Sequence, residues 1–222
     1  VDTYRDATAE ALLLLEWLRH ARARGERPDL LARVRSHAAR VAGGPLVAER
    51  TAASLLGWAL LLEGEHREAA EPLAAARGAC RREPAILHHE PLVLIGLGLA
   101  RLELGDIERA RLVIEEAVAA ARTRAMCELE CQAQIARAAV LRRSVGGRAE
   151  EAIAASIERA AWLVERTRHR VHAPAIREER ARLAGLRGDA DGFTQELREA
   201  HRAYMEIDAW GHAARLAEEL AS

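Results

Sequence analysis

The chain has 222 residues, of which half are hydrophobic and only 3% are aromatic, and its formal net charge is −1. A near-neutral charge creates no field that would draw the chain to nucleic acid or to an anionic membrane. The three cysteines are too few for a disulfide scaffold, and the longest apolar run, 91–100, is about half of what a membrane span needs. We therefore expect a cytoplasmic protein whose core is built from small side chains.

The first two predicted hairpins cover residues 3–42 and 46–82. Their helices are expected over 3–23, 30–41, 47–63 and 67–81, with a stop signal at 42–45, Ala-Gly-Gly-Pro. Pro72 falls inside the fourth of these helices, where it removes a backbone hydrogen bond. It predicts a kink in that helix or a late start.

Three further hairpins follow a connector at 82–91 that holds His88 and His89. They are predicted over 91–122, 123–168 and 173–207. A single helix over 208–221 ends the chain, where it would cover the last apolar face of a stack of hairpins.

A glycine recurs between the two helices of each hairpin, about every 40 residues: Gly25, Gly64, Gly105, Gly147 and Gly188. Glycine ends a helix readily because it adopts positive φ. In the third unit we expect Asp106 to be the N-cap of the next helix, and Gly98 with Ala110 to let the two helices approach closely. A constant period of this length predicts a helical solenoid, since each hairpin has an apolar stripe that only a neighbour can bury.

Two units resemble the tetratricopeptide repeat (TPR). They carry the Leu-Gly pair, the turn glycine and the small residues of that family: Leu56-Gly57, Gly64, Ala69, Leu73 and Ala76, and Leu97-Gly98, Gly105, Ala110, Ile114 and Ala117. The resemblance implies an all-α, right-handed superhelix of about five antiparallel hairpins plus a capping helix, forming one domain over 1–222. It also implies a protein–protein interaction module with a concave binding face.

The C-terminal quarter, over 173–184, 188–189, 197–201 and 211–220, resembles the repeat regions of bacterial STAND-type ATPases joined to class III adenylate cyclases, or of LuxR-type (MalT-like) regulators. This resemblance implies a regulatory role in signalling or transcription. An arginine-only set of basic residues fits a GC-rich bacterial genome, and a chain that begins with Val1 is expected to be part of a larger protein.

The expected concave face carries an apolar middle flanked by arginine and glutamate, so it could bind a peptide or a small anion. The predicted partner-binding residues on it are Arg19, Trp58, Leu61, Leu62, Leu99, Leu102, Glu103, Gln134, Arg137, Glu178 and Arg182. The alternative is that Trp58 and the leucines belong to the core.

Other reactive residues have simpler explanations. Cys127 and Cys131 share one helix face, but a metal site needs two more ligands, so we interpret them as buried apolar residues rather than as metal ligands or redox sensors. His169 and His172, among arginines, are predicted to lie in a solvated basic loop. Gly96 to Ala100 lies within a helix, so it is not a nucleotide-binding loop. We predict no catalytic residue, no metal and no cofactor.

The leading hypothesis is a regulatory module that binds a protein segment, or upstream domains of its own chain, on the concave face. The alternative is a domain that senses a small-molecule inducer for a STAND-type regulator or cyclase. A free-standing adaptor, or an enzyme built around His88 to Glu90, is a weaker alternative. Direct binding of nucleic acid or membrane is not expected.

Overall fold

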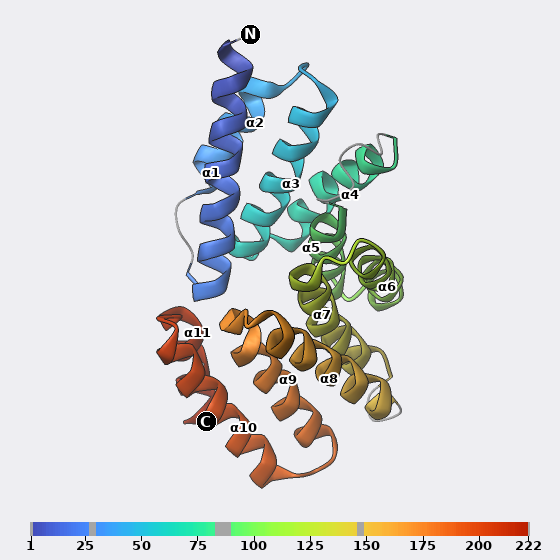
Figure 1. The fold of residues 1–222 in the computed structure, drawn as a ribbon, viewed down its shortest axis with the longest axis vertical. Helices are drawn as coiled ribbons and strands as arrows, with labels where there is room; N and C mark the ends of the chain where they lie inside the picture. Colours follow the sequence, from blue (N-terminus) through green and yellow to red (C-terminus); the bar gives the residue numbers. More distant parts are fainter. Residues whose placement is uncertain (1, 27–29, 83–89, 146–148, 222) are drawn as a thin grey trace.

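The computed structural model describes residues 2–26, 30–82, 90–145 and 149–221, and all regular structure in these ranges is helical (Figure 1). The prediction of an all-α solenoid of hairpins is confirmed. The α-helices are α1 (Asp2–Arg24), α2 (Leu31–Val41), α3 (Leu46–Glu63), α4 (His66–Arg82), α5 (Glu90–Glu103), α6 (Ile107–Thr123), α7 (Cys127–Val145), α8 (Glu150–Thr167), α9 (Ala173–Leu186), α10 (Ala190–Glu206) and α11 (Trp210–Leu220). A short 3₁₀ helix, η3 (Arg170–His172), precedes α9.

The turn glycines behave as the repeat predicts. Gly25, Gly64, Gly105 and Gly188 all have positive φ, between 66° and 83°. Gly147 lies outside the described residues. Positive φ lets the chain leave one helix and reverse into the next, which other residues do only at a cost.

Two glycines bring the helices of a hairpin together. A Cβ atom on Gly57 would lie 2.9 Å from Cδ2 of Leu73, and one on Gly98 would lie 2.5 Å from Cγ1 of Ile114. Real Cβ atoms do not approach so closely, so only glycine permits this spacing. Leu73 and Ile114 are fully buried as a result.

Two local predictions need correction. Asp106 precedes α6 at the N-cap position, but its side chain makes no capping hydrogen bond and instead lies 3.3 Å from Arg109. The late start suggested by Pro72 is wrong, because α4 begins at His66 and continues through the proline. Successive turns of α4 pack on α3 and α5, and this tertiary packing outweighs the loss of one hydrogen bond.

The curvature of the stack brings the end of the first helix to the start of the last one, although the two termini lie far apart (Figure 1). α1 packs on α2 and α3, the chain descends through α5 and α7, and α9 to α11 return beneath α1 (Figure 1). The last turn of α1 contacts the first turn of α11, where Nε2 of His212 donates a hydrogen bond to the carbonyl oxygen of Arg22 at 2.9 Å. The repeat therefore closes around its concave side. None of the described helices is both long and apolar enough to cross a membrane.

Candidate functional site

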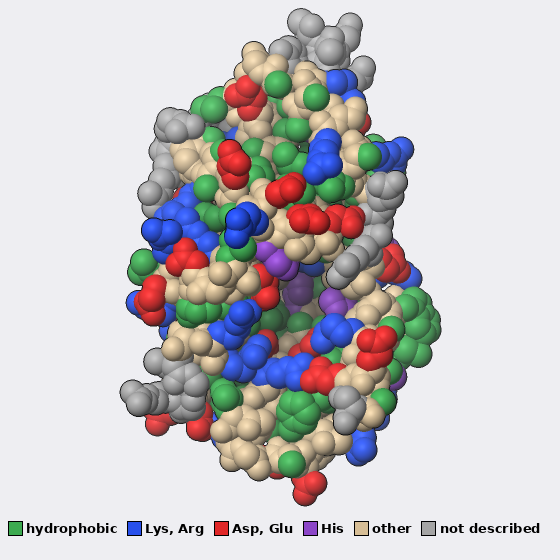
Figure 2. Space-filling model, turned by 180° about the vertical axis from the view of Figure 1, so that it is seen from behind, with side chains coloured by type: hydrophobic (Ala, Val, Ile, Leu, Met, Phe, Trp, Pro, Cys, Tyr) green, Lys and Arg blue, Asp and Glu red, His purple; other side chains and the backbone are tan. Residues whose placement is uncertain are grey.

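A pocket of about 470 Å³ lies on the concave side, between α1, α5, α7, η3, α9, α10 and α11. It appears as a hollow at mid-height of the molecule, with histidine side chains inside and around it (Figure 2). Its polar lining consists of Glu16, Arg19, His20, Arg22, Glu128, Gln132, His169, His172, Glu179, Tyr204 and His212. Ile95, Leu99 and Val171 give it an apolar wall.

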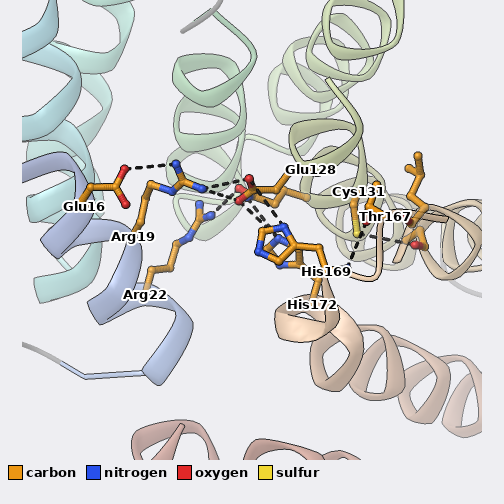
Figure 3. Close-up of polar contacts among 11 residues, drawn as sticks. Glu16, Arg19, Arg22, Glu128, Cys131, Thr167, His169 and His172 are labelled. Atoms are coloured by element: carbon orange, nitrogen blue, oxygen red, sulfur yellow. Dashed lines mark hydrogen bonds and ion pairs between the residues drawn. The ribbon is translucent and has the colours of Figure 1, made fainter. Parts of the chain in front are cut away.

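Glu128, at the start of α7, is the centre of the polar network in this pocket (Figure 3). Nη2 of Arg19 donates to both of its carboxylate oxygens, at 2.8 and 3.0 Å. Nε2 of His172 lies 3.8 Å from Oε1, and Nδ1 of His169 lies 3.9 Å from Oε2. His172 and Arg19 lower the pKa of Glu128 to about 2, against the opposing effect of burial. The carboxylate is therefore ionised at every physiological pH.

Arg22, on α1, extends into the same pocket. Its guanidinium donates to Oε1 of Gln132 and lies 4.6 Å from the ring centroid of Trp58. Among the described residues, no carboxylate oxygen lies close enough to the Arg22 guanidinium to form an ion pair. Burial lowers its pKa to about 10, which means that the protein stabilises the charge less well than water does.

Glu179 and Tyr204 form the floor of the pocket, on α9 and α10. Glu179 is 3.5 Å from Arg142, but its Oε2 is buried without a hydrogen-bond partner in the part of the chain that the structure describes, and burial raises its pKa. Tyr204 donates to Oε1 of Glu178 at 2.6 Å and stacks on His212, with ring centroids 4.7 Å apart. This stacking connects the floor to the contact between α1 and α11.

Of the eleven residues predicted to bind a partner, Arg19 and Leu99 line the pocket. Trp58 is only 6% exposed and belongs to the core, as do Leu102 and the half-buried Leu61 and Leu62 packed against it. The alternative interpretation, in which Trp58 and these leucines are core residues, therefore fits their burial. Gln134 is buried in α7.

The remaining charged residues of that set hold helices together. Glu103 pairs with Arg143 at 2.9 Å, which joins α5 to α7. Arg137 donates to Glu115 and to Ser156, each at 2.7 Å, and so links α6, α7 and α8. Two α9 residues contact the end of the chain: Glu178 accepts from Arg215 at 2.7 Å, and Arg182 pairs with Glu219.

The positions of Cys127 and Cys131 agree with the interpretation that they are apolar residues. Cys131 is 2% exposed, its Sγ lies 3.7 Å from the carbonyl oxygen of Ala160, and burial raises its pKa to about 12. Cys127 is half-buried at the start of α7. His88 and His89 lie outside the described residues. Glu90 begins α5 and pairs with Arg124 at 2.6 Å.

The prediction that His169 and His172 lie in a solvated basic loop is wrong for His172. Its side chain is only 15% exposed and faces Glu128 inside the pocket, whereas that of His169 is 46% exposed. η3 turns the segment inward. Four pocket residues were not predicted as site residues from the sequence: Glu128, Gln132, Arg22 and His212. They lie on three helices, and Arg22 is 110 positions from Gln132 and 190 positions from His212.

Comparison with known proteins supports the architecture. A putative kinesin light chain of Podospora anserina with nearly identical TPR-like repeats aligns over 90% of this chain and 95% of its own, with a TM-score of 0.60 and 15% identity. No protein-family model matches the chain, and no curated protein matches it in sequence. At this identity the likeness concerns the fold alone: the chain is similar to TPR-like repeat proteins in structure.

Proposed function

We propose that this chain is a TPR-like regulatory module of a bacterial signalling or transcription-regulating protein, and that its pocket binds a small organic anion. The observation that carries the proposal is Arg22, a desolvated guanidinium in the pocket without a carboxylate in contact among the described residues. Glu128 attracts this charge without forming an ion pair with it, and an anionic ligand in contact with the guanidinium would supply a closer partner.

The other charged groups of the pocket already have partners, so Arg22 is where a ligand charge fits best. Arg19 is bound to Glu128 and lies 3.4 Å from Glu16. Glu179 lies 3.5 Å from Arg142, which is its charged partner. An arginine fork can hold a carboxylate or a phosphate through two parallel hydrogen bonds.

The size and lining of the pocket favour a small molecule over a protein segment. Its volume of about 470 Å³ lies within the range of small-molecule sites. Ile95, Leu99 and Val171 offer an apolar surface beside the arginines. A metabolite with one anionic group and a short apolar body matches both features.

The pocket also provides a route for regulation. Its walls come from both ends of the repeat, so a bound ligand would contact α1 on one side and α7, η3, α9 and α10 on the other. Binding would then favour the closed arrangement of the chain over an open one. This is the behaviour expected of an inducer-sensing region attached to an ATPase, a cyclase or a DNA-binding domain.

The test is a thermal-shift screen of small carboxylates and phosphate esters against the wild type and two variants. Arg22→Met removes the charge and keeps an apolar contact with Trp58, so the ligand-free protein should keep its melting temperature or gain a few degrees. Its affinity for the anion should fall about 10- to 100-fold, the equivalent of one charged hydrogen bond. Arg109→Gln is the control, because that arginine is 72% exposed and lies outside the pocket.

Two results would contradict the proposal. Binding to Arg22→Met that equals binding to the wild type would remove Arg22 from the site. Unfolding of Arg22→Met without any ligand effect in the wild type would make Arg22 a structural residue.

A protein partner is the second candidate, since TPR-like repeats generally mediate protein–protein interactions. The observation that favours it is a group of exposed apolar side chains on α1: Leu12, Leu13 and Trp17 are 58%, 60% and 44% exposed. These residues lie outside the pocket lining, so the two candidates concern different surfaces. Loss of partner binding in Leu13→Ser, with anion binding intact, would identify the protein site separately.

A further inference from the structure

Three potential metal ligands converge at one side of the pocket. Glu128 comes from the first turn of α7, His169 immediately precedes the short helix η3, and His172 is its last residue (Figure 3). A 3₁₀ helix has three residues per turn, so residues separated by three positions lie on the same side. One ligand atom of each residue lies within 4.8 Å of the other two.

The distances between these atoms suit an ion better than direct hydrogen bonds. The carboxylate oxygens lie 3.8 Å from Nε2 of His172 and 3.9 Å from Nδ1 of His169, beyond the usual range of a hydrogen bond. Zinc binds imidazole nitrogen at 2.0–2.1 Å in a tetrahedron, which places neighbouring ligand atoms about 3.3 Å apart. Each imidazole would have to move about half an ångström toward the carboxylate, and the two histidine nitrogens, which lie within 4.8 Å of each other, would also have to approach.

We propose that Glu128, His169 and His172 bind one divalent transition-metal ion, with zinc as the best match. Two imidazoles and a carboxylate are a known donor set for zinc sites that keep one position open for water or for another ligand. Imidazole nitrogen favours zinc, nickel or cobalt over magnesium or calcium, which prefer oxygen. The open position would face the pocket.

The protonation states of Glu128 and His172 suit metal binding. Burial, the largest effect, lowers the pKa of His172, so its imidazole is neutral at pH 7 and can donate a lone pair. Glu128 is ionised, as its pKa of about 2 requires. No proton has to be removed from these two ligands at neutral pH.

The neighbours of Glu128 provide the outer support that metal ligands usually have. Nη2 of Arg19 holds both carboxylate oxygens, and Nε2 of Gln132 donates to Oε1 at 3.2 Å. In Figure 3 the arginines approach Glu128 from one side and the histidines from the other. Arg19 can therefore orient the carboxylate of Glu128, and the remaining lone pairs of the carboxylate oxygens are free to point to the ion. The positive charges of Arg19 and Arg22 reduce the affinity for a cation and favour an anion at its open position.

The metal site does not depend on the proposed anion, and it is tested with the metal alone. The full chain is treated with a chelator, freed of it and titrated with ZnCl₂ in a calorimeter. CoCl₂ is then used to report the coordination through its visible absorption. We expect one ion per chain, a cobalt spectrum typical of four- or five-coordinate sites, and no binding of magnesium under the same conditions.

His169→Ala is the decisive variant because its half-exposed side chain can be removed without disturbing the core. It should bind zinc at least tenfold more weakly, as should His172→Ala. His201→Ala, on α10 outside the pocket, and Cys127→Ser, beside Glu128, should bind zinc as the wild type does. Absence of zinc binding in the wild type, or equal affinity in His169→Ala, would overturn the proposal. Loss of binding in Cys127→Ser would assign the metal to the thiols instead.

Discussion

The contact between α1 and α11 closes the pocket, and a matched pair of glycine variants can test it. Gly25 and Gly64 both end a helix with positive φ, at 66° and 83°. A Cβ atom on Gly64 would meet nothing within 4 Å, whereas one on Gly25 would lie 2.6 Å from the backbone nitrogen of His212. Replacing each by alanine therefore imposes the same backbone strain, and Gly25→Ala adds a clash with α11.

The expected losses follow from these two contributions. A left-handed conformation costs a residue with a Cβ about 1–2 kcal/mol, so Gly64→Ala should lower the free energy of unfolding by that amount. Ordinary contacts between such atoms begin near 3.5 Å, so in Gly25→Ala the two helices must separate by about 1 Å. Overpacking of this kind costs about 1–3 kcal/mol more.

Calorimetric melting of both variants would measure the difference. For a chain of this length each kcal/mol corresponds to about 2–4 °C, so Gly25→Ala should melt several degrees below Gly64→Ala. Gly211→Ala should disturb the same contact from the other side, because its Cβ would lie 2.5 Å from the carbonyl carbon of Gly25. The double variant Gly25→Ala/Gly211→Ala should then lose less than the sum of the two. Equal losses in Gly25→Ala and Gly64→Ala would refute the closure.

Three further outcomes can be measured. Trp58→Ala should lower the free energy of unfolding by about 3–5 kcal/mol in urea, because Trp58 is buried in the core; a small loss would return it to a binding surface. Glu128→Gln should be less stable than the wild type at pH 7. Since folding lowers the pKa of Glu128, this difference should persist above pH 5 and shrink as the pH falls toward 2, and melting curves that show no such trend would disprove the network. Cys131 should resist iodoacetamide in the folded protein at pH 8 while the half-buried Cys127 reacts, as mass spectrometry of peptides would show.

The fold was predictable because its main determinants are local. A glycine with positive φ ends a helix through its own backbone, so its spacing along the chain reports the repeat directly. Gly98 also acts over a short stretch of sequence: its role depends on Ile114, which lies on the next helix of the same hairpin. Relations between residues that are close in the sequence can be recognised without a structure.

The pocket could not be predicted in the same way. Arg19 and Glu128 are separated by 109 positions, and Arg22 and His212 by 190, so their meeting depends on the summed curvature of all the hairpins. Repeat period gives no measure of that curvature. His172 was misplaced for the same reason, since a basic segment beside a turn resembles a solvated loop unless a carboxylate from another repeat faces it. The arginines predicted on the concave face, by contrast, mostly found partners within or between neighbouring hairpins.

Closure of the repeat and occupation of the pocket must be linked, because the pocket is lined from both sides of the contact between α1 and α11. Arg22 offers its guanidinium to the pocket and its carbonyl oxygen to His212. A ligand that holds this guanidinium therefore stabilises the closed form, and by reciprocity a variant that opens the contact must bind the ligand more weakly. Gly25→Ala lies outside the pocket lining, yet it should lose affinity for the anion relative to Gly64→Ala, which has the same backbone strain and no clash. Isothermal titration of both variants would measure this coupling. Equal affinities would mean that the pocket binds its ligand without sensing the closure, and a signal would then have to leave the module by another surface.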